Sequence, residues 1–150
     1  RMRVRKPTQT AMRPKQMTQH DYAALAAFRQ SLREFLSFSE EAARKAGLPP
    51  QQHQALLAIR GFGAGRGVTV GDLAFHFVLN EQNLVGLGYR IVRAKLVGRT
   101  HDPADRRRVL LTLTAKADRV LTALSAAHLV EMRRNAPALG RLIRRFSARR

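Results

Sequence analysis

Two short apolar segments that almost touch in the sequence constrain the fold of this chain most strongly. Residues 71–78 (GDLAFHFV) and 80–95 (NEQNLVGLGYRIVRAK) both have helical character, and Asn80 is a suitable N-cap for the second helix. Because Leu79 alone separates the two segments, the helices are expected to pack at a steep angle. This arrangement is typical of a helix-turn-helix.

A predicted β-hairpin follows this pair of helices directly. Residues 96–101 (LVGRTH) and 109–114 (VLLTLT) read as two strands around an arginine-rich loop. By the period of two in a strand, Val109, Leu111 and Leu113 are expected to share one face. A hairpin in this position is a wing, whose tip is expected to lie beside a DNA duplex while the preceding helix enters the major groove.

The loop of that hairpin holds Arg106, Arg107 and Arg108, next to Asp105. Arginine suits a narrow, strongly negative minor groove, because its charge is permanent and its guanidinium is weakly hydrated. The alternative is a solvated charged turn. Since the cluster falls where a winged helix needs it, we favour a role for these arginines in DNA binding.

The predicted recognition helix, residues 80–95, divides into two faces. Leu84, Leu87 and Ile91 have core spacing and are expected to face inward. Gln or Asn reads adenine edges, and Arg reads guanine or holds phosphate. The candidate DNA-binding residues of the outward face are Gln82, Asn83, Gly86, Arg90 and Arg93.

Helical segments flank this central part on both sides. Thr18 and Asp21 resemble a capping pair for a long helix that ends near Gly47. A second helix begins at Pro49-Pro50 and ends in the glycine-rich residues 61–67, before a short extended piece, 68–70. In the first helix, residues of one face recur at helical spacing. They are the apolar Leu25, Phe28, Leu32, Phe35 and Leu36, followed by Ser39.

After the hairpin, a long helix is predicted from Thr114 to about Asn135, and Pro137 is expected to open a final short helix. The apolar pattern at both ends of the chain lies too far from the central motif to be covered by it, which predicts a homodimer. The expected fold class is mainly α with a small β-hairpin.

The charge of the chain indicates its class of partner. Twenty-eight Lys and Arg face 10 Asp and Glu, a formal net charge of +18, which attracts polyanions. Nucleic acid is the first candidate, an anionic membrane surface the second, and a merely soluble basic protein the third. The chain has no cysteine, and no apolar run approaches the ~18 residues of a membrane span. These features predict a reduced, cytoplasmic protein without a cofactor, and residues 1–19 read as a flexible basic arm.

Other kinds of site find little support in the sequence. The histidines at 20, 53, 76, 101 and 128 lack the spacing of helical zinc ligands, although His53 is a candidate for lining a ligand pocket. The segment GFGAGRG lacks the Lys-Ser/Thr of a P-loop, and no nucleophile elbow is present, so an enzyme is not expected. The aromatic residues Phe28, Phe35, Phe62 and Tyr89 are expected in the core.

Residues 73–117 carry the pattern of a known family: a Leu-Ala helix start, Leu-Val-x-Arg after the recognition helix, an Asp-x-x-Asp-Arg-Arg wing and a Leu-Thr strand end. The matching residues are Leu73, Ala74, Leu87, Arg90, Leu96, Val97, Arg99, Asp102, Asp105, Arg106, Arg107, Leu113 and Thr114. Over roughly residues 20–146 the chain resembles the MarR-type winged-helix transcription regulators. It departs from the pattern at Lys95, where the family has glycine.

The resemblance implies one domain over residues 20–150, with dimerisation helices at 20–47 and 115–146 and a DNA-binding winged helix at 50–114. It implies a homodimer on a near-palindromic double-stranded DNA operator, a small aromatic anion as ligand, and Asp105 bracing a wing arginine. No membrane partner is implied. The alternatives are a basic nucleic-acid-binding protein of low sequence specificity and a winged helix kept as a protein-interaction module.

Overall fold

A computed structural model describes residues 17–77 and 81–147, without the side chains of residues 81 and 82. The predicted N-cap Asn80 lies outside the described residues. The fold is mainly helical with one antiparallel hairpin, as expected. The elements are α1 (Gln19–Lys45), α2 (Pro50–Phe62), α3 (Val70–Phe77), α4 (Glu81–Arg93), β1 (Val97–His101), β2 (Val109–Leu113) and α5 (Ala115–Ser147).

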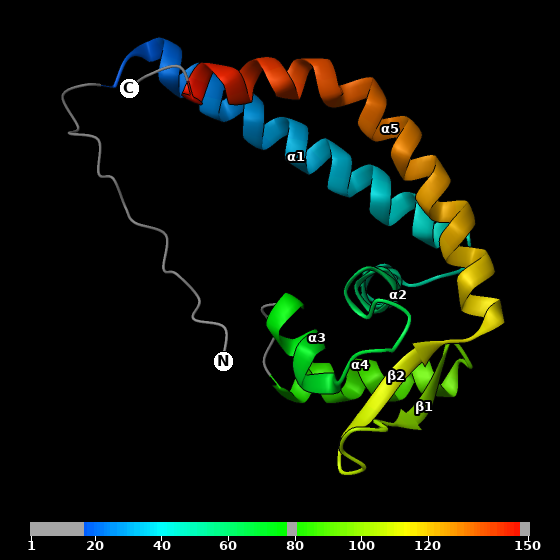
Figure 1. Ribbon diagram of the computed structural model, residues 1–150. Helices are drawn as coiled ribbons and strands as arrows, with labels where there is room; N and C mark the ends of the chain where they lie inside the picture. The colour runs from blue at the N-terminus through cyan, green and yellow to red at the C-terminus, as the bar shows by residue number, and fades with distance from the viewer. Residues whose placement is uncertain (1–16, 78–80, 148–150) are drawn as a thin grey trace.

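The two long helices, α1 and α5, lie side by side as an arch over the rest of the molecule (Figure 1). The predicted capping pair starts α1: the Asp21 amide donates to Thr18 Oγ1 at 3.2 Å, and the Thr18 amide donates to Asp21 Oδ2 at 2.9 Å. Phe28, in the N-terminal half of α1, meets Phe146, at the C-terminal end of α5. The two rings lie edge to face with centroids 6.4 Å apart. The helices therefore run antiparallel and stay in contact over most of their length.

Below the arch, the short helices and the hairpin enclose a hydrophobic core. Apolar burial of this kind contributes about 25 cal/mol per Å² removed from water. The start of α3 is fixed by a second capping box, in which Thr69 and Asp72 exchange bonds of 2.9 and 3.0 Å. The largest fully buried side chains are Leu56, Leu73, Leu87, Ile91 and Leu111.

The hairpin pairs Val97 with Leu113 and His101 with Val109. Val68 adds a single bridge to Leu111, and this contact brings the glycine-rich loop against β2. Gly67 has a φ of +94°, and a Cβ there would lie 2.7 Å from the Leu111 carbonyl oxygen. Glycine is therefore required at the point where the loop and the strand meet.

The C-terminal helix corrects one prediction. Pro137 lies inside a continuous α5 and does not open a separate helix. Proline removes one backbone bond and crowds the preceding turn, which usually kinks or ends a helix. Here α5 curves around α1 (Figure 1), and packing such as Phe28 on Phe146 holds the last turns in place.

Packing between elements overturns several smaller predictions. Val70 begins α3 and does not extend a strand, because Thr69 caps the helix there. In β2, Leu110 lies on the face opposite Val109, Leu111 and Leu113 and is buried as well, a burial the sequence did not predict, since the loop at Gly67 covers that face. Phe62 is 63% exposed, with its ring stacked 3.8 Å from that of His76, so it is not a core residue.

Thr114 joins the hairpin, the end of α4 and the start of α5. Its hydroxyl donates to the Lys95 carbonyl oxygen at 2.8 Å and accepts from the Ala117 amide at 3.3 Å. Its own amide donates to the Leu96 carbonyl oxygen at 3.1 Å. Lys95 has a φ of +57°, so the position where the family pattern has glycine does take up the left-handed conformation. We call this set of bonds the Thr114 clasp.

A buried histidine pair joins the arch to α2. The rings of His53 and His128 lie 5.0 Å apart, centroid to centroid. His128 Nδ1 bonds the Leu124 carbonyl oxygen, and its Nε2 lies 2.7 Å from the Ser39 hydroxyl oxygen. Burial, with the nearby charge of His128 as a second cause, lowers the pKa of His53 below its ordinary value of 6.5.

This pKa makes the fold sensitive to acid. Below pH 6.5 the unfolded chain binds a proton at residue 53 that the folded chain resists, so the free energy of unfolding falls as the pH falls towards the lowered pKa. We expect the free energy of unfolding, measured with urea, to fall less between neutral and acid pH for His53→Gln than for the parent. The exposed His20→Gln serves as the matched control and keeps the parent slope. Equal slopes for the parent and His53→Gln would contradict the assignment.

Candidate nucleic-acid interface

Helix α4 presents one face to the core and one to solvent, as the sequence predicts. Leu84, Leu87 and Ile91 are buried at 2%, 1% and 0% exposure. On the other side, Asn83, Arg90 and Arg93 are exposed, and Gly86 is partly buried. A Cβ on Gly86 would lie 3.4 Å from Arg90 Nη1, so the arginine side chain folds back over the glycine. The side chain of Gln82 lies outside the described part.

Two residues of this outer face were missed from the sequence. Val85 and Tyr89 are 64% and 61% exposed, although Tyr89 was expected in the core. They stand four residues apart, on the side of α4 away from Leu84 and Leu87. Residues at this spacing share one face of a helix, and this was the signal in the sequence that places both on the outer face. Apolar groups on such a face contact the methyl group of thymine. Both residues therefore belong with the candidate DNA-binding set.

Backbone bonds shape the loop at the tip of the wing. The Asp102 amide donates to the Arg108 carbonyl oxygen and the Arg108 amide to the Asp105 carbonyl oxygen, both at 3.0 Å. Asp102 Oδ1 accepts from the Ala104 amide at 2.9 Å. His101 Nδ1 lies 2.9 Å from the Arg106 carbonyl oxygen. The turn is thus held by its own peptide groups together with the side chains of His101 and Asp102.

The acids of the wing act differently from the expectation. Asp105 Oδ1 accepts from the backbone amide of Arg107 at 3.1 Å, so it positions this residue through the main chain. The ion pair of the loop joins Arg108 Nη1 to Asp102 Oδ2, at 3.8 Å. Within residues 17–77 and 81–147, Arg106 and Arg107 make no ion pair and are exposed. These two guanidinium groups are the free cations at the tip.

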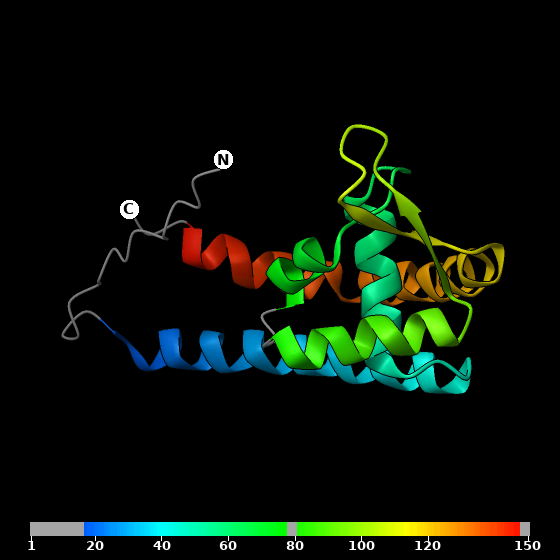
Figure 2. The ribbon, with the colours of Figure 1, turned by 90° about the horizontal axis from the view of Figure 1, so that it is seen from below.

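The wing and α4 lie on the same side of the molecule, away from the arch (Figure 1). From below, α4 runs across the front, and the hairpin tip extends from one edge (Figure 2). The fold thus places α4, the helix that carries Arg90 and Arg93, on the same side of the molecule as the wing. This geometry suits a helix in the major groove with a wing beside it.

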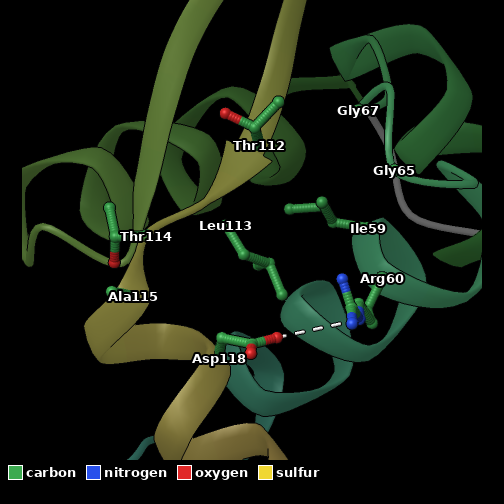
Figure 3. Close-up of a pocket in the computed structure, with 9 residues that line it drawn as sticks. All are labelled: Ile59, Arg60, Gly65, Gly67, Thr112, Leu113, Thr114, Ala115 and Asp118. Carbon is green, nitrogen blue, oxygen red and sulfur yellow. Dashed lines mark ion pairs between the residues drawn. The ribbon is translucent and has the colours of Figure 1, made fainter.

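A pocket lies behind this surface, where α2, the glycine-rich loop, β2 and α5 meet (Figure 3). Its volume is about 300 Å³, and Ile59 and Leu113 contribute its apolar lining. At one side, Arg60 Nε lies 3.7 Å from Asp118 Oδ1, with both side chains about half exposed. Among the described residues, no three His, Asp or Glu side chains gather as metal ligands do. The described helices also include none that is long and apolar enough to cross a membrane.

Comparison with known proteins identifies this architecture. The transcriptional activatory protein BadR of Rhodopseudomonas palustris is 37% identical over 79 residues, which is 53% of this chain and 45% of BadR. The chain thus spans less than half the length of this relative.

Two solved structures share the fold. CouR from Rhodococcus jostii RHA1, bound to p-coumaroyl-CoA, is 24% identical with a TM-score of 0.62, over 72% of this chain and 74% of CouR. A MepR mutant from S. aureus, bound to an oligodeoxyribonucleotide, is 19% identical with a TM-score of 0.58, over 89% of this chain and 100% of MepR.

A family model gives the same answer from the sequence. The model of the MarR family matches residues 46–108, which run from the end of α1 to the wing. The matched segment includes α4 and all three wing arginines, so it covers the surface described above. Fold and sequence agree in what they resemble: residues 46–108 match the MarR family model, and the chain has a winged helix-turn-helix fold.

Proposed function

We propose that the protein is a cytoplasmic, dimeric transcription regulator that binds double-stranded DNA in a sequence-specific manner. The observation that carries the proposal is the common side shared by the outer face of α4 and the free cations of the wing, Arg106 and Arg107. A MepR mutant with the same fold is bound to an oligodeoxyribonucleotide, which supports the proposal. The family consists of transcription regulators and not of enzymes.

In this proposal α4 reads bases in the major groove. Gln82, Asn83, Gly86, Arg90 and Arg93 are its DNA-binding residues, and Val85 and Tyr89 join them. Arg106, Arg107 and Arg108 hold the neighbouring backbone and minor groove, and Asp105 positions Arg107. The alternative, binding of low sequence specificity, uses the same cations without the base contacts. Competition between a selected duplex and random duplexes separates the two.

The first prediction concerns Arg107. A charge-assisted contact contributes about 1.5–3 kcal/mol, so Arg107→Ala should weaken binding of a duplex selected from a random library by about tenfold or more. Each lost phosphate contact should also flatten the dependence of log affinity on log salt by about 0.9. Fluorescence anisotropy measures both quantities. The matched control is Arg33→Ala on α1, which removes an equal charge from an exposed site on the arch.

Asp105→Ala gives a test in which simple electrostatics and positioning predict opposite signs. Removing a negative charge beside DNA should tighten binding. Removing the bond to the Arg107 amide should loosen the turn and weaken binding. We expect the weaker binding. Tighter binding by Asp105→Ala, with Arg107→Ala equal to the parent, would refute the role of the wing.

The dimer in this proposal forms on the arch. Apolar side chains of both long helices remain 41% to 55% exposed, far above what a core residue shows. They are Leu25, Leu32 and Leu36 on α1, and Leu129, Met132 and Ile143 on α5. Since α1 and α5 lie side by side, these residues offer a broad apolar surface, which a second copy of the chain covers.

Light scattering at micromolar concentration should give about twice 16.8 kDa. Met132→Glu places a charge in the proposed interface, and burial of an unpaired charge should raise the dimer dissociation constant by about tenfold or more. Val130→Glu is the matched control, because Val130 lies two residues away, is similarly exposed at 57%, and points to a different side of α5. A parent mass of a monomer at every concentration would contradict the dimer.

A small aromatic anion is the proposed ligand, in line with the CouR complex with p-coumaroyl-CoA. The pocket of Figure 3 suits such a ligand, because its volume of about 300 Å³ accepts a single aromatic ring. Arg60, now 3.7 Å from Asp118, can pair with the carboxylate of the ligand in place of Asp118. Because the lining comes from α2, β2 and α5, a ligand in this pocket contacts both the arch and the winged helix, and can change how they are oriented relative to each other.

Titration of benzoate and cinnamate into the protein–DNA complex tests this ligand class. We expect saturable release of DNA, with the half-point shifted about tenfold or more higher in Arg60→Ala, because a charge-assisted bond is lost. Arg66→Ala, on the neighbouring loop, should respond as the parent does. If neither acid binds the parent, the pocket assignment fails, while DNA binding is judged by the Arg107 experiment.

A further inference from the structure

The C-terminal half of α5 carries a dense set of cations outside the surface proposed for DNA. No acidic residue follows Glu131 in the sequence. Among the described residues, the one ion pair of this segment joins Arg134 to Glu131, at 3.7 Å. Its arginines are Arg133, Arg134, Arg141, Arg144 and Arg145.

These arginines share one side of the helix. At 3.6 residues per turn, Arg133, Arg141 and Arg144 fall within about 80° of arc, and all three are exposed. They span about 17 Å of helix, which matches about five phosphates along one strand of a duplex. The apolar residues of the proposed dimer interface, such as Met132 and Ile143, centre on a different side of α5. We call this set the arginine face.

Helix chemistry alone does not account for the arginine face. Cations stabilise the last turn of a helix, and Arg144 and Arg145 lie there, but the effect fades beyond that turn. Arg133 and Arg141 lie farther from the end at Ser147. Like charges at Arg141, Arg144 and Arg145 are also three and four residues apart, a spacing that destabilises a helix by about 0.2–0.5 kcal/mol per pair. An external polyanion removes that repulsion.

The position of the arginine face separates it from the wing. The end of α5, drawn in red, lies at the upper left of Figure 1, and the hairpin tip lies at the bottom, on the other side of the winged helix. A duplex that lies along α4 and the wing therefore does not reach the arginine face. A second polyanion is needed to occupy it.

We propose that the arginine face binds the phosphate backbone of a second DNA duplex, so that one protein molecule bridges two duplexes. All the cations are arginines, whose planar guanidinium groups hold phosphate oxygens in pairs. The second duplex is bound through its phosphates, without base recognition. The arginine face lies on the outer surface of a curved helix, which contacts the DNA backbone and does not enter a groove.

A duplex fits this face better than a membrane surface does. A helix that lies in a membrane interface places large apolar side chains beside its cations. Here the large exposed apolar side chains of this half of α5, such as Met132 and Ile143, are those proposed to be covered by the second copy of the chain, and so they are not free to enter a membrane. A Cβ on Gly140 would lie 3.2 Å from Arg144 Nη1, so the Arg144 guanidinium lies against the helix at this glycine.

The test is a bridging assay with the full chain. A biotinylated mixed-sequence duplex is saturated with protein on beads, and capture of a second, labelled mixed-sequence duplex is measured against salt. The parent should capture it. Arg133→Ala with Arg141→Ala and Arg144→Ala should reduce capture at least tenfold and flatten the salt slope by about 2.7, at about 0.9 for each contact. The matched control removes three exposed α1 cations, as Arg33→Ala with Arg44→Ala and Lys45→Ala, and should capture as the parent does.

Two further arms decide the outcome. The triple Lys variant of Arg133, Arg141 and Arg144 keeps the charge and should keep most of the capture, which separates lost charge from lost folding. Binding to vesicles of phosphatidylglycerol and phosphatidylcholine is measured in parallel. Equal capture by the α5 and α1 triple variants overturns the proposal, as does a loss of vesicle binding alone. Loss of the first duplex by Arg107→Ala is measured separately, so failure of the wing and failure of the arginine face give different results.

Discussion

The Thr114 clasp is the interaction on which the rest of the structure depends. A single hydroxyl bonds the Lys95 carbonyl oxygen at the end of α4 and caps the first turn of α5. The amide of the same residue bonds the Leu96 carbonyl oxygen at the edge of the hairpin. The helix proposed to read DNA, the wing and the long helix of the arch thus meet at one residue. Lys116 Nζ adds a bond to the Ala94 carbonyl oxygen at 3.3 Å, and the shared core packs the same three parts together, so the clasp and the core set their relative angles.

The sequence was sufficient for the elements whose signals are local. The capping pair Thr18 and Asp21, the proline start of α2 and the strand alternation around the arginine loop depend on neighbouring residues, and each prediction was confirmed. The predictions that failed depended on distant packing. Pro137 remains in α5 because α1 supports the last turns, and Phe62 is exposed because its ring stacks on His76 outside the core.

The candidate site divides in the same way. The inward residues of α4 follow from periodicity, and the wing arginines from their place after a helix-turn-helix. The exposed Tyr89 and the true partner of Asp105 did not follow from the sequence, because an aromatic ring favours the core on average and an acid beside arginines suggests an ion pair. In the structure Asp105 bonds a backbone amide, and Asp102 takes the ion pair. Only the loop geometry distinguishes these two roles.

The charge of +18 is therefore organised by the fold and not spread evenly. Cations gather at the wing and at the far end of α5, while the junction between them holds the buried His53–His128 pair and the apolar core. Because α5 runs unbroken from the clasp to the arginine face, its orientation at one end fixes its orientation at the other. Anything that tilts α5 at Thr114, including a ligand against Asp118, moves the proposed interface of the dimer and the arginine face together. The spacing of the two recognition helices in the proposed dimer is then a direct consequence of how the clasp holds α5.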